Sequence, residues 1–346
     1  MKHFFYFLAV AFAVSSCSQP FKKAKDGTQY KIIKAKNGKK IAPGNYMELY
    51  VVVKYRDSLL MNSFDDGMPQ YAAYDTTQFP PLFKELFKDI SIGDSLVLKF
   101  STDSLINKQQ AAPFMKKGYF IVQSFKIQNA FGTKEQSDSA AKTHLTVARN
   151  RAYKKATDQL KKDLSTTLAP QMKIDEKILT DYMNKMGTKA SKAEWGTFVA
   201  ISNPGTGETL NEKSVALVNY TGKSLTDSVF DSNVDPKFGH VEPYSVDMTQ
   251  FNVMPGWIDG LKMLKKGSKA TFLIPSSLGY GKNGRQPAIK PNENLVFDIE
   301  VVDVITPEQH EAMQMAKQQE QMAMQQKMQE EAMKNAQKKT TPEGKK

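Results

Sequence analysis

The chain has 346 residues, of which 40% are hydrophobic and 10% aromatic, which is enough to fill two hydrophobic cores. Its formal net charge is +12, but the lysines are spread along the chain among acidic residues and form no arginine-rich stripe with the arginines. This pattern argues against a nucleic-acid partner and favours a solvated basic surface.

The N-terminal segment has the pattern of a secretory signal. Lys2 precedes an apolar run over residues 4–14, which is too short to span a bilayer as a helix. The tetrapeptide "VSSC" that ends at Cys17 resembles the lipobox of bacterial lipoproteins. The resemblance implies that residues 1–17 are a lipoprotein signal peptide and that lipid on Cys17 holds the protein at a membrane. A plain signal peptide with an incidental cysteine is the alternative.

A lipid on Cys17 predicts localisation to the bacterial cell envelope. Ser18 and Gln19 carry no obvious signal for retention at an inner membrane, and no acidic export tract follows them. We therefore expect anchoring at the outer membrane, on either its periplasmic face or the cell surface. Cys17 is the only cysteine, so the chain cannot form an intramolecular disulfide.

Two parts of the chain repeat each other. Each has a Gly-Thr pair, an alternating strand, a glycine-containing turn and a second strand that carries Tyr50 or Tyr220. The matching segments are 26–53 with 195–222, and 79–105 with 253–279. The repeat predicts two copies of one fold, over residues 26–130 and 195–305.

Residues 133–192, between the two copies, are rich in Ala, Lys, Asp and Gln. Apolar side chains recur there at helical intervals, for example Leu160 and Leu164. The segment predicts a helical connector that is broken near Pro170 and Gly187.

Residues 306–346 form a tail rich in Met, Gln, Lys and Glu, which predicts a solvated helix or a disordered segment. Its methionines, among them Met315, Met322 and Met324, keep no clean heptad. The tail could form either a lone amphipathic helix or a coiled coil. A coiled coil would allow a homodimer through the helical segments.

Within the second copy, "PGWIDGLKMLKKGSKATFLIP" changes from a helical to a strand period. Pro255 suits the first turn of a helix, and Gly267 suits the left-handed cap that would end it. The apolar face repeats at i, i+4 and i+7, with Trp257, Leu261 and Leu264. Residues 269–274 then alternate as a strand.

The last strand of this copy alternates as well. Leu295, Phe297 and Ile299 face one side, and Val296 and Asp298 the other. The copy is therefore expected to be a half-covered antiparallel sheet with one short helix, an α+β arrangement.

Five motifs now stand in a characteristic order: "VNYTG", "VFDSN", "PGWIDGLKMLKKGSKATFLIP", "LGYG" and "NLVFDIEVVDV". Over residues 195–305 the sequence resembles the FKBP-type peptidyl-prolyl cis/trans isomerases. The resemblance implies an antiparallel sheet wrapped around a short helix, with an aromatic cup on the concave face and the helix tryptophan as its floor. The whole chain would then hold two such copies, a helical connector and a C-terminal tail.

The resemblance also implies a set of catalytic residues around this cup. They are Tyr220, Phe230, Asp231, Tyr244, Val253, Met254, Trp257, Tyr280 and Phe297. In the family's pattern, Tyr280 and the Met254 N–H hold peptide carbonyls, and Asp231 orients Tyr220 and meets the carbonyl of the twisting bond. The simpler reading is that Tyr220 and Phe297 are ordinary core residues on alternating strands. Arg285 stands where the family often has histidine, which puts macrolide affinity in doubt.

The activity implied is isomerisation of Xaa-Pro bonds in unfolded or exported polypeptides, without a cofactor. Rotation about such a bond is slow unaided, and an apolar cup can favour the twisted, less polar amide. The alternative is a non-catalytic chaperone or scaffold that binds proline-containing segments at the envelope. The histidines show no metal-ligand spacing; they are His3, His144, His240 and His310.

The first copy keeps few of the implied cup residues. Tyr50 is taken as the counterpart of Tyr220, but Leu60-Met61 stands in place of Phe-Asp, Phe83 in place of the tryptophan, and Ile106 in place of the loop tyrosine. Residues 26–130 are therefore expected to form a degenerate, inactive FKBP-like domain.

Overall fold

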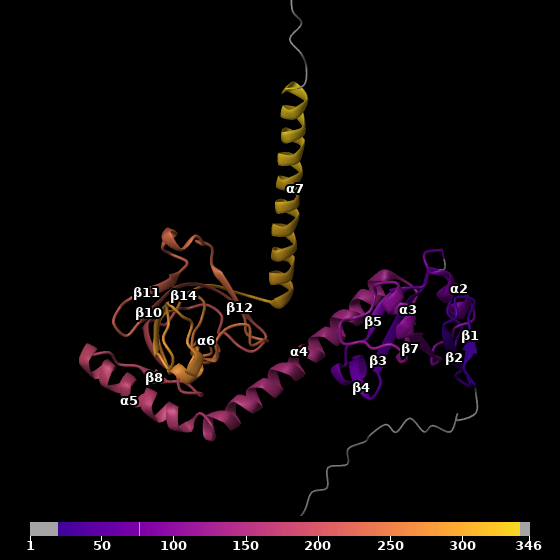
Figure 1. Cartoon of the computed structure of the whole chain (residues 1–346). Coiled ribbons are helices and arrows are strands. Elements are labelled where there is room, and N and C mark those ends of the chain that lie inside the picture. The colour runs from indigo at the N-terminus through magenta and orange to yellow at the C-terminus, as the bar shows by residue number, and fades with distance from the viewer. Residues whose placement is uncertain (1–19, 76, 340–346) are drawn as a thin grey trace, which may run out of the picture. The chain divides into compact units, whose positions relative to one another are not determined.

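The computed structural model describes residues 20–75 and 77–339, coloured in Figure 1. The predicted signal peptide and Cys17 lie outside the described residues. The chain divides into two compact units, Met1–Ala148 and Arg149–Lys346. In the part of the chain that the structure describes, no helix combines the length and apolar character needed to cross a bilayer.

The N-terminal unit contains one antiparallel sheet in the order β1-β2-β6-β7-β3-β4, with β5 paired to β3. Its strands are β1 (Lys22–Lys23), β2 (Gln29–Ile33), β3 (Tyr46–Tyr55), β4 (Ser58–Asn62), β5 (Gln70–Ala73), β6 (Ser95–Ser101) and β7 (Phe120–Phe131). Its short helices are α1 (Ser63–Asp66), α2 (Pro81–Phe87) and α3 (Thr102–Asn107).

The C-terminal unit repeats this arrangement with the order β8-β9-β13-β14-β10-β11, and with β12 paired to β10. Its strands are β8 (Ser191–Lys192), β9 (Phe198–Asn203), β10 (Val215–Ser224), β11 (Val229–Ser232), β12 (Tyr244–Asp247), β13 (Lys269–Ile274) and β14 (Leu295–Ile305). The short helix is α6 (Pro255–Leu261), and single 3-10 turns are η1 (Pro236–Phe238), η2 (Ser276–Leu278) and η3 (Gly281–Asn283).

Three longer helices complete the described part of the chain: α4 (Lys134–Ser165), α5 (Ala169–Met186) and α7 (Pro307–Lys339). Pro170 lies in the first turn of α5, and Gly187 ends that helix in the left-handed conformation, with φ +66°. The predicted fold class is confirmed: two antiparallel sheets, each with a short helix, are linked through α4 and α5 and followed by a helical tail.

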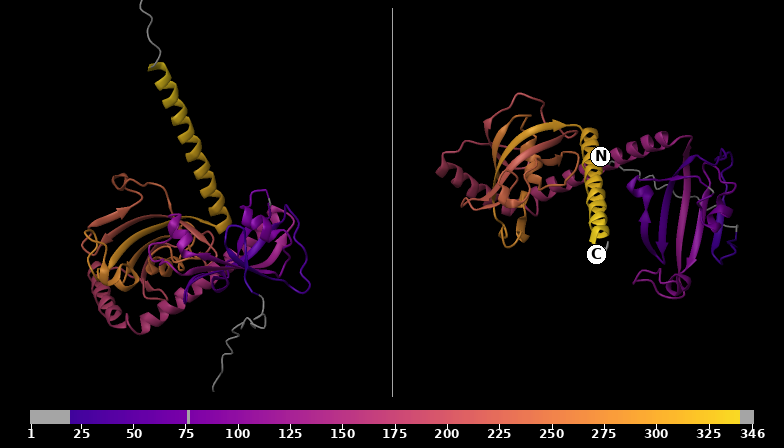
Figure 2. Two further views of the ribbon diagram at one scale, coloured as in Figure 1. Left: turned by 45° about the vertical axis from the view of Figure 1, so that its right-hand side comes forward. Right: turned by 90° about the horizontal axis from the view of Figure 1, so that it is seen from above.

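The C-terminal sheet curls around α6, as the two views of Figure 2 show. Helix α6 lies close to β13 because its sheet-facing positions are Gly256 and Gly260. A Cβ atom at Gly260 would lie 2.6 Å from the ring of Phe272, and one at Gly256 would collide with Ile274. These glycines let the short helix lie flat against the sheet and present Trp257 on its other side.

The helix prediction was too long. We expected it to continue through Leu264 to a cap at Gly267, but α6 ends at Leu261. The next residues bond to another segment instead: the N–H of Leu210 donates to the carbonyl of Leu264, and the N–H of Lys266 donates to that of Glu208. Gly267 lies in the turn into β13, with φ +84°.

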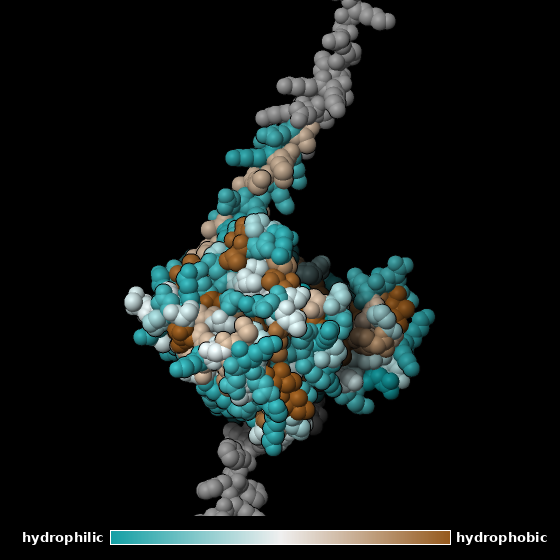
Figure 3. All heavy atoms as spheres, turned by 90° about the vertical axis from the view of Figure 1, so that its left-hand side faces the viewer, coloured by the Kyte–Doolittle hydropathy of each residue, from teal (hydrophilic) through white to brown (hydrophobic). Residues whose placement is uncertain are grey.

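The prediction of a half-covered sheet also needs correction. Leu179 and Met183 of α5 pack with Phe198 of β9 and Leu273 of β13 on the outer face of the C-terminal sheet. The helix therefore covers part of the face that was expected to be solvated. On the face shown in Figure 3, hydrophobic side chains form small separate patches among hydrophilic ones.

The two sheets can be aligned residue by residue through their β-bulges. The bulge lies between Glu48 and Leu49 in β3, and between Leu217 and Val218 in β10. Counting from these bulges places Val51, and not Tyr50, at the position of Tyr220.

The same type of hydrogen bond, from a strand N–H to a side-chain oxygen, occurs in both sheets and supports this alignment. The backbone N–H of Val51 donates to Ser63 Oγ (2.8 Å), and that of Tyr220 donates to Asn233 Oδ1 (2.6 Å). Tyr50 therefore lies on the opposite face, where its ring stacks on Phe64 with centroids 4.3 Å apart. The prediction that Tyr50 replaces Tyr220 is wrong, because a shift of one residue turns a strand side chain to the other face.

Candidate active site

The predicted site residues come together around a single cavity of about 530 Å³ in the C-terminal unit. Every one of them lines it: Tyr220, Phe230, Asp231, Tyr244, Val253, Met254, Trp257, Tyr280 and Phe297. Four further residues complete the lining, namely Phe251, Asn252, Gly279 and Arg285. The structure thus gathers residues from four strands, one helix and the connecting segments; their catalytic roles stay a prediction.

Trp257 forms the floor and is only 4% exposed. Its ring meets those of Tyr220 and Phe297 edge to face, with centroids 5.1 and 5.2 Å apart. The buried indole Nε1 has no hydrogen-bond partner among the described residues. The floor therefore offers apolar and aromatic surface, with aromatic contacts of the preferred geometry.

Helix α6 is held in place by Asp259, which is nearly fully buried. Its carboxylate accepts hydrogen bonds from the backbone N–H groups of Trp195 (2.9 Å) and Thr197 (3.0 Å). Burial raises the pKa of Asp259, and the hydrogen bond from Thr197 opposes that rise. The helix that carries Trp257 is thereby tied to the turn before β9.

One wall depends on a glycine that the sequence reasoning did not single out. The rings of Phe230 and Phe297 meet edge to face at 5.6 Å beside Gly222. A Cβ atom at Gly222 would lie 2.5 Å from the Phe297 ring and 2.8 Å from that of Phe230. Any larger residue would push these rings apart. The motif "VNYTG" contains this glycine, so the signal was present.

A polar network stands at one side of the cavity. The Tyr220 hydroxyl donates to Asp231 Oδ2 (2.9 Å), and His240 Nε2 lies 3.0 Å from Asp231 Oδ1. Burial, followed by this hydrogen bond, raises the pKa of Tyr220 well above its usual value, so its hydroxyl remains protonated. Sequence reasoning considered His240 only as a metal ligand, and no spacing rule pointed to its place beside Asp231.

On the other side, Arg285 Nη1 donates to the Tyr280 hydroxyl at 3.4 Å. The residue that departs from the expected histidine therefore lines the cavity and leaves the Tyr280 O–H available as a donor. At the rim, Tyr244 is 43% exposed and meets Trp257 edge to face at 6.1 Å. Met254 directly precedes α6 in an extended conformation, with φ −58° and ψ 142°.

Comparison with known families identifies the segment that builds this cavity. Residues 206–302 match the family model described as FKBP-type peptidyl-prolyl cis-trans isomerase. Residues 206–302 form an FKBP-type domain. The match contains all of the predicted cavity residues, and the strands and short helix that hold them.

Several known proteins are similar to the FKBP-type domain and its flanks. A probable FKBP-type peptidyl-prolyl cis-trans isomerase of Haemophilus influenzae is 37% identical over 118 residues, which are 34% of this chain and 46% of that protein. FkpA of Escherichia coli is 33% identical over 179 residues, which are 51% of this chain and 62% of FkpA. The chain thus spans between 46% and 62% of the length of these relatives.

The solved structure of Escherichia coli FkpA aligns with 60% of this chain and 83% of its own, at 27% identity and a TM-score of 0.32. A peptidyl-prolyl cis-trans isomerase from Pseudomonas syringae aligns with 40% of this chain and 95% of its own, at 24% identity and the same TM-score of 0.32. The assignment of the FKBP-type domain rests on the family match over residues 206–302.

The cavity of the FKBP-type domain suits an apolar ligand segment with a few carbonyl groups. Its floor and walls are aromatic, and its donors and acceptors stand at the edges: the Tyr280 hydroxyl, and the Asp231 carboxylate that holds Tyr220. Binding sites for small or extended ligands commonly have this composition.

Proposed function

We propose that the C-terminal unit is a peptidyl-prolyl cis/trans isomerase that accelerates rotation about Xaa-Pro bonds. The observation that carries the proposal is the enclosure of one cavity by Tyr220, Trp257, Tyr280 and Phe297 in an FKBP-type domain. The isomerase names of the relatives support the same activity.

The reaction can be accelerated by an apolar environment around the peptide bond, without a nucleophile or a general acid or base. The barrier to rotation about a peptide bond is about 18–20 kcal/mol and arises from amide resonance. The twisted amide has lost this resonance, so its carbonyl is less polar and is desolvated at lower cost than the planar amide. An aromatic cavity that excludes water therefore binds the twisted form better than either planar isomer. A barrier lowered by about 4 kcal/mol corresponds to roughly a thousandfold in rate.

The polar groups orient the substrate in this cavity. The Tyr280 hydroxyl and the backbone N–H of Met254 hold carbonyl groups on either side of the proline. Asp231 fixes the Tyr220 hydroxyl through its 2.9 Å hydrogen bond and faces the carbonyl of the twisting bond. Since the high pKa of Tyr220 keeps it protonated, no step depends on its ionisation.

The substrates we propose are proline-containing segments of unfolded, exported polypeptides. Proline isomerisation limits the folding of many such chains, and the cavity is open at its rim, where Tyr244 is exposed. The secretory pattern of residues 1–17 and the lipobox at Cys17 support a site of action at the cell envelope, with lipid as the membrane anchor.

A second function, binding of unfolded segments without catalysis, is favoured by the surface of the N-terminal unit. β4 lies at the edge of its sheet, and it exposes large apolar side chains together with α1 and the following turn. These are Leu59, Leu60, Met61, Phe64 and Met68. An exposed apolar edge strand is suited to contact with another polypeptide.

Isomerisation of a short Xaa-Pro peptide by the full chain, followed by NMR exchange, separates the two functions. We expect Asp231→Ala to lower kcat/KM by at least about tenfold, and Tyr280→Phe by about 2- to 12-fold, the equivalent of one hydrogen bond. Asp65→Ala, on α1 of the N-terminal unit, is the matched control and should leave kcat/KM unchanged. A wild-type rate equal to that of buffer would leave only the non-catalytic function.

A further inference from the structure

The connector helices contact two segments that contribute residues to the cavity. Asp175 of α5 has no exposed surface, although it carries a carboxylate. Its Oδ2 accepts hydrogen bonds from Ser276 Oγ (2.8 Å) and the backbone N–H of Ser277 (3.3 Å). Its Oδ1 accepts one from Gln171 Nε2 (2.8 Å) on the same helix. A buried carboxylate is costly unless such partners satisfy it, and two of the three belong to the turn η2.

The turn η2 leads to the cavity residue Tyr280, which follows its last residue by two positions. The same turn is also bonded from the other side, because the backbone N–H of Ser276 donates to Asn294 Oδ1 (2.8 Å). The backbone leading to Tyr280 is therefore held between Asn294, just before β14, and Asp175 of the connector. Removing either partner leaves a buried donor unsatisfied and frees the turn to shift.

Helix α4 contacts another cavity residue, Phe251. The ring of Tyr153, which is 8% exposed, packs against that of Phe251 with centroids 5.2 Å apart. Phe251 lines the cavity and stacks on Trp195 at 5.8 Å, with an angle of 17° between the rings. It precedes Val253 and Met254 in the segment that enters α6.

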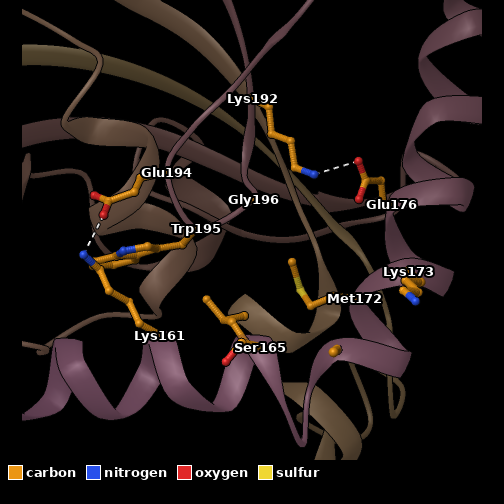
Figure 4. Close-up of a pocket in the computed structure, with 11 residues that line it drawn as sticks. Lys161, Ser165, Met172, Lys173, Glu176, Lys192, Glu194, Trp195 and Gly196 are labelled. Atoms are coloured by element: carbon orange, nitrogen blue, oxygen red, sulfur yellow. Dashed lines mark hydrogen bonds and ion pairs between the residues drawn. The ribbon is translucent and has the colours of Figure 1, made fainter. Parts of the chain in front are cut away.

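Further contacts hold both helices against the segment that leads into β9 (Figure 4). Lys161 of α4 pairs with Glu194 (2.7 Å), and Glu176 of α5 with Lys192 (2.6 Å), on either side of a hollow of about 480 Å³. Met172 lies so close to Gly196 that a Cβ there would be 2.7 Å from its Cε. Both helices are thus packed against the segment before β9, which Asp259 ties to α6.

We propose that α4 and α5 position the active site, with Asp175 holding the turn that leads to Tyr280 and Tyr153 holding Phe251. Both are positioning residues, since neither lines the cavity. The inference rests on the proposed isomerase function, and it makes the catalytic unit larger than residues 195–305: it includes the helices from Arg149 onward.

Asp175→Ala in the full chain tests the proposal. We expect kcat/KM for the Xaa-Pro peptide to fall about tenfold or more, because a misplacement of about 1 Å can cost up to ~10²-fold. The ring NMR signal of Tyr280, assigned through Tyr280→Phe, should shift, while that of Tyr71 in the N-terminal unit should not. Asp181→Ala is the matched control on the same helix, since Asp181 is exposed and pairs with Lys177.

Ser276→Ala probes the same link from the other side and keeps the test valid if Asp175→Ala does not fold. It should shift the Tyr280 signal in the same direction. In a double-mutant cycle, the decrease in kcat/KM caused by Ser276→Ala should not add to the decrease caused by Asp175→Ala. For α4, Tyr153→Ala should shift the ring signal of Phe251 and lower kcat/KM.

A folded Asp175→Ala protein with an unmoved Tyr280 signal and kcat/KM within about twofold of wild type would overturn the proposal. The Tyr280 signal also distinguishes a failure of the proposed isomerase function from a failure of the proposed positioning by Asp175. A wild-type chain without isomerase activity refutes the proposed function, whereas the signal still reports whether Asp175 positions the turn.

Discussion

The two sheets of this chain share strand order, register and bulge position, yet only one surrounds the aromatic set of an FKBP-type cavity. Along β10 the inner face presents Tyr220 and Gly222, and at the matching positions β3 presents Val51 and Val53. The common topology therefore fixes where side chains point. A few residues at those points decide whether a binding cavity can form.

The short helices differ in the same way. In α6, Gly256 and Gly260 face the sheet and Trp257 faces the cavity. At the positions of these glycines α2 has Leu82 and Leu86, which pack into the N-terminal core. The leucines of α2 thus add apolar side chains to the core of their unit. The glycines of α6 add none, and the large ring on this helix, Trp257, lines the cavity instead.

The largest expected effect concerns the two cores. Phe272 and Leu98 occupy matching strand positions and are fully buried. We expect Phe272→Ala to lower the free energy of unfolding by about 4 kcal/mol and Leu98→Ala by about 3 kcal/mol. Both tryptophans, Trp195 and Trp257, lie in the C-terminal unit, so urea unfolding followed by their fluorescence should respond only to Phe272→Ala.

Circular dichroism should detect the unfolding of both units and serves as the control measurement. If Leu98→Ala shifts the tryptophan transition as strongly as Phe272→Ala does, the two units unfold together. The comparison of two separately folded copies would then fail.

The next effect is on activity. Replacing Phe230 and Asp231 by the residues of the first copy, Phe230→Leu with Asp231→Met, should lower kcat/KM by about 100-fold, or about 2.7 kcal/mol. The change removes one aromatic wall and the carboxylate that holds Tyr220. Measurement is by NMR exchange of an Xaa-Pro peptide.

The reverse change, Leu60→Phe with Met61→Asp, is the control in the N-terminal unit. It should add no activity to a chain silenced by Asp231→Ala, because Val51, Phe83 and Ile106 still stand where the cavity has Tyr220, Trp257 and Tyr280. Isomerase activity from that unit would show that catalysis requires fewer of the aromatic cavity residues than we infer.

A smaller effect is expected at the helix–sheet contact. Gly260→Ala should cost about 2 kcal/mol, because the added methyl group would lie 2.6 Å from the Phe272 ring in a packed core. Helix propensity alone predicts the opposite, a gain of about 1 kcal/mol for Gly to Ala. Urea unfolding decides between the two: a more stable variant would mean that α6 can move away from β13.

The smallest effect is that of one hydrogen bond. Tyr220→Phe should lower the free energy of unfolding by about 1 kcal/mol at pH 7. Because folding raises the pKa of Tyr220, its contribution is fully present below the unfolded tyrosine pKa of about 10 and is lost as the pH rises through the folded value. The difference between wild type and variant should therefore be constant from pH 7 to about 10 and shrink above. A difference that grows with pH would contradict this assignment.

Much of the C-terminal unit could be predicted from local patterns. The alternation over residues 269–274 predicted the bounds of β13, and the motif order predicted which residues surround one cavity. An alternating pattern is reliable where a strand has one buried face, because only one register then places the apolar side chains on that face. The catalytic roles of these residues remain predictions.

Other features were decided by contacts between distant segments. The matching bulges of β3 and β10 and the hydrogen bonds beside them place Val51, and not Tyr50, at the position of Tyr220. The end of α6 was set by backbone bonds to residues 208 and 210, which end the helix earlier than its apolar spacing suggested.

The sequence by itself determined the alternation of β13 and β14, since a strand with one buried face has a side-chain period of two. The set of residues around the cavity followed from the resemblance of its motifs to the FKBP-type family. Only the tertiary structure decided that His240 lies beside Asp231, that Gly222 makes room for two rings and that Asp175 bonds to the turn before Tyr280. The physical reason is that periodicity acts along the chain. A buried polar or steric contact instead depends on which distant group fills the neighbouring space.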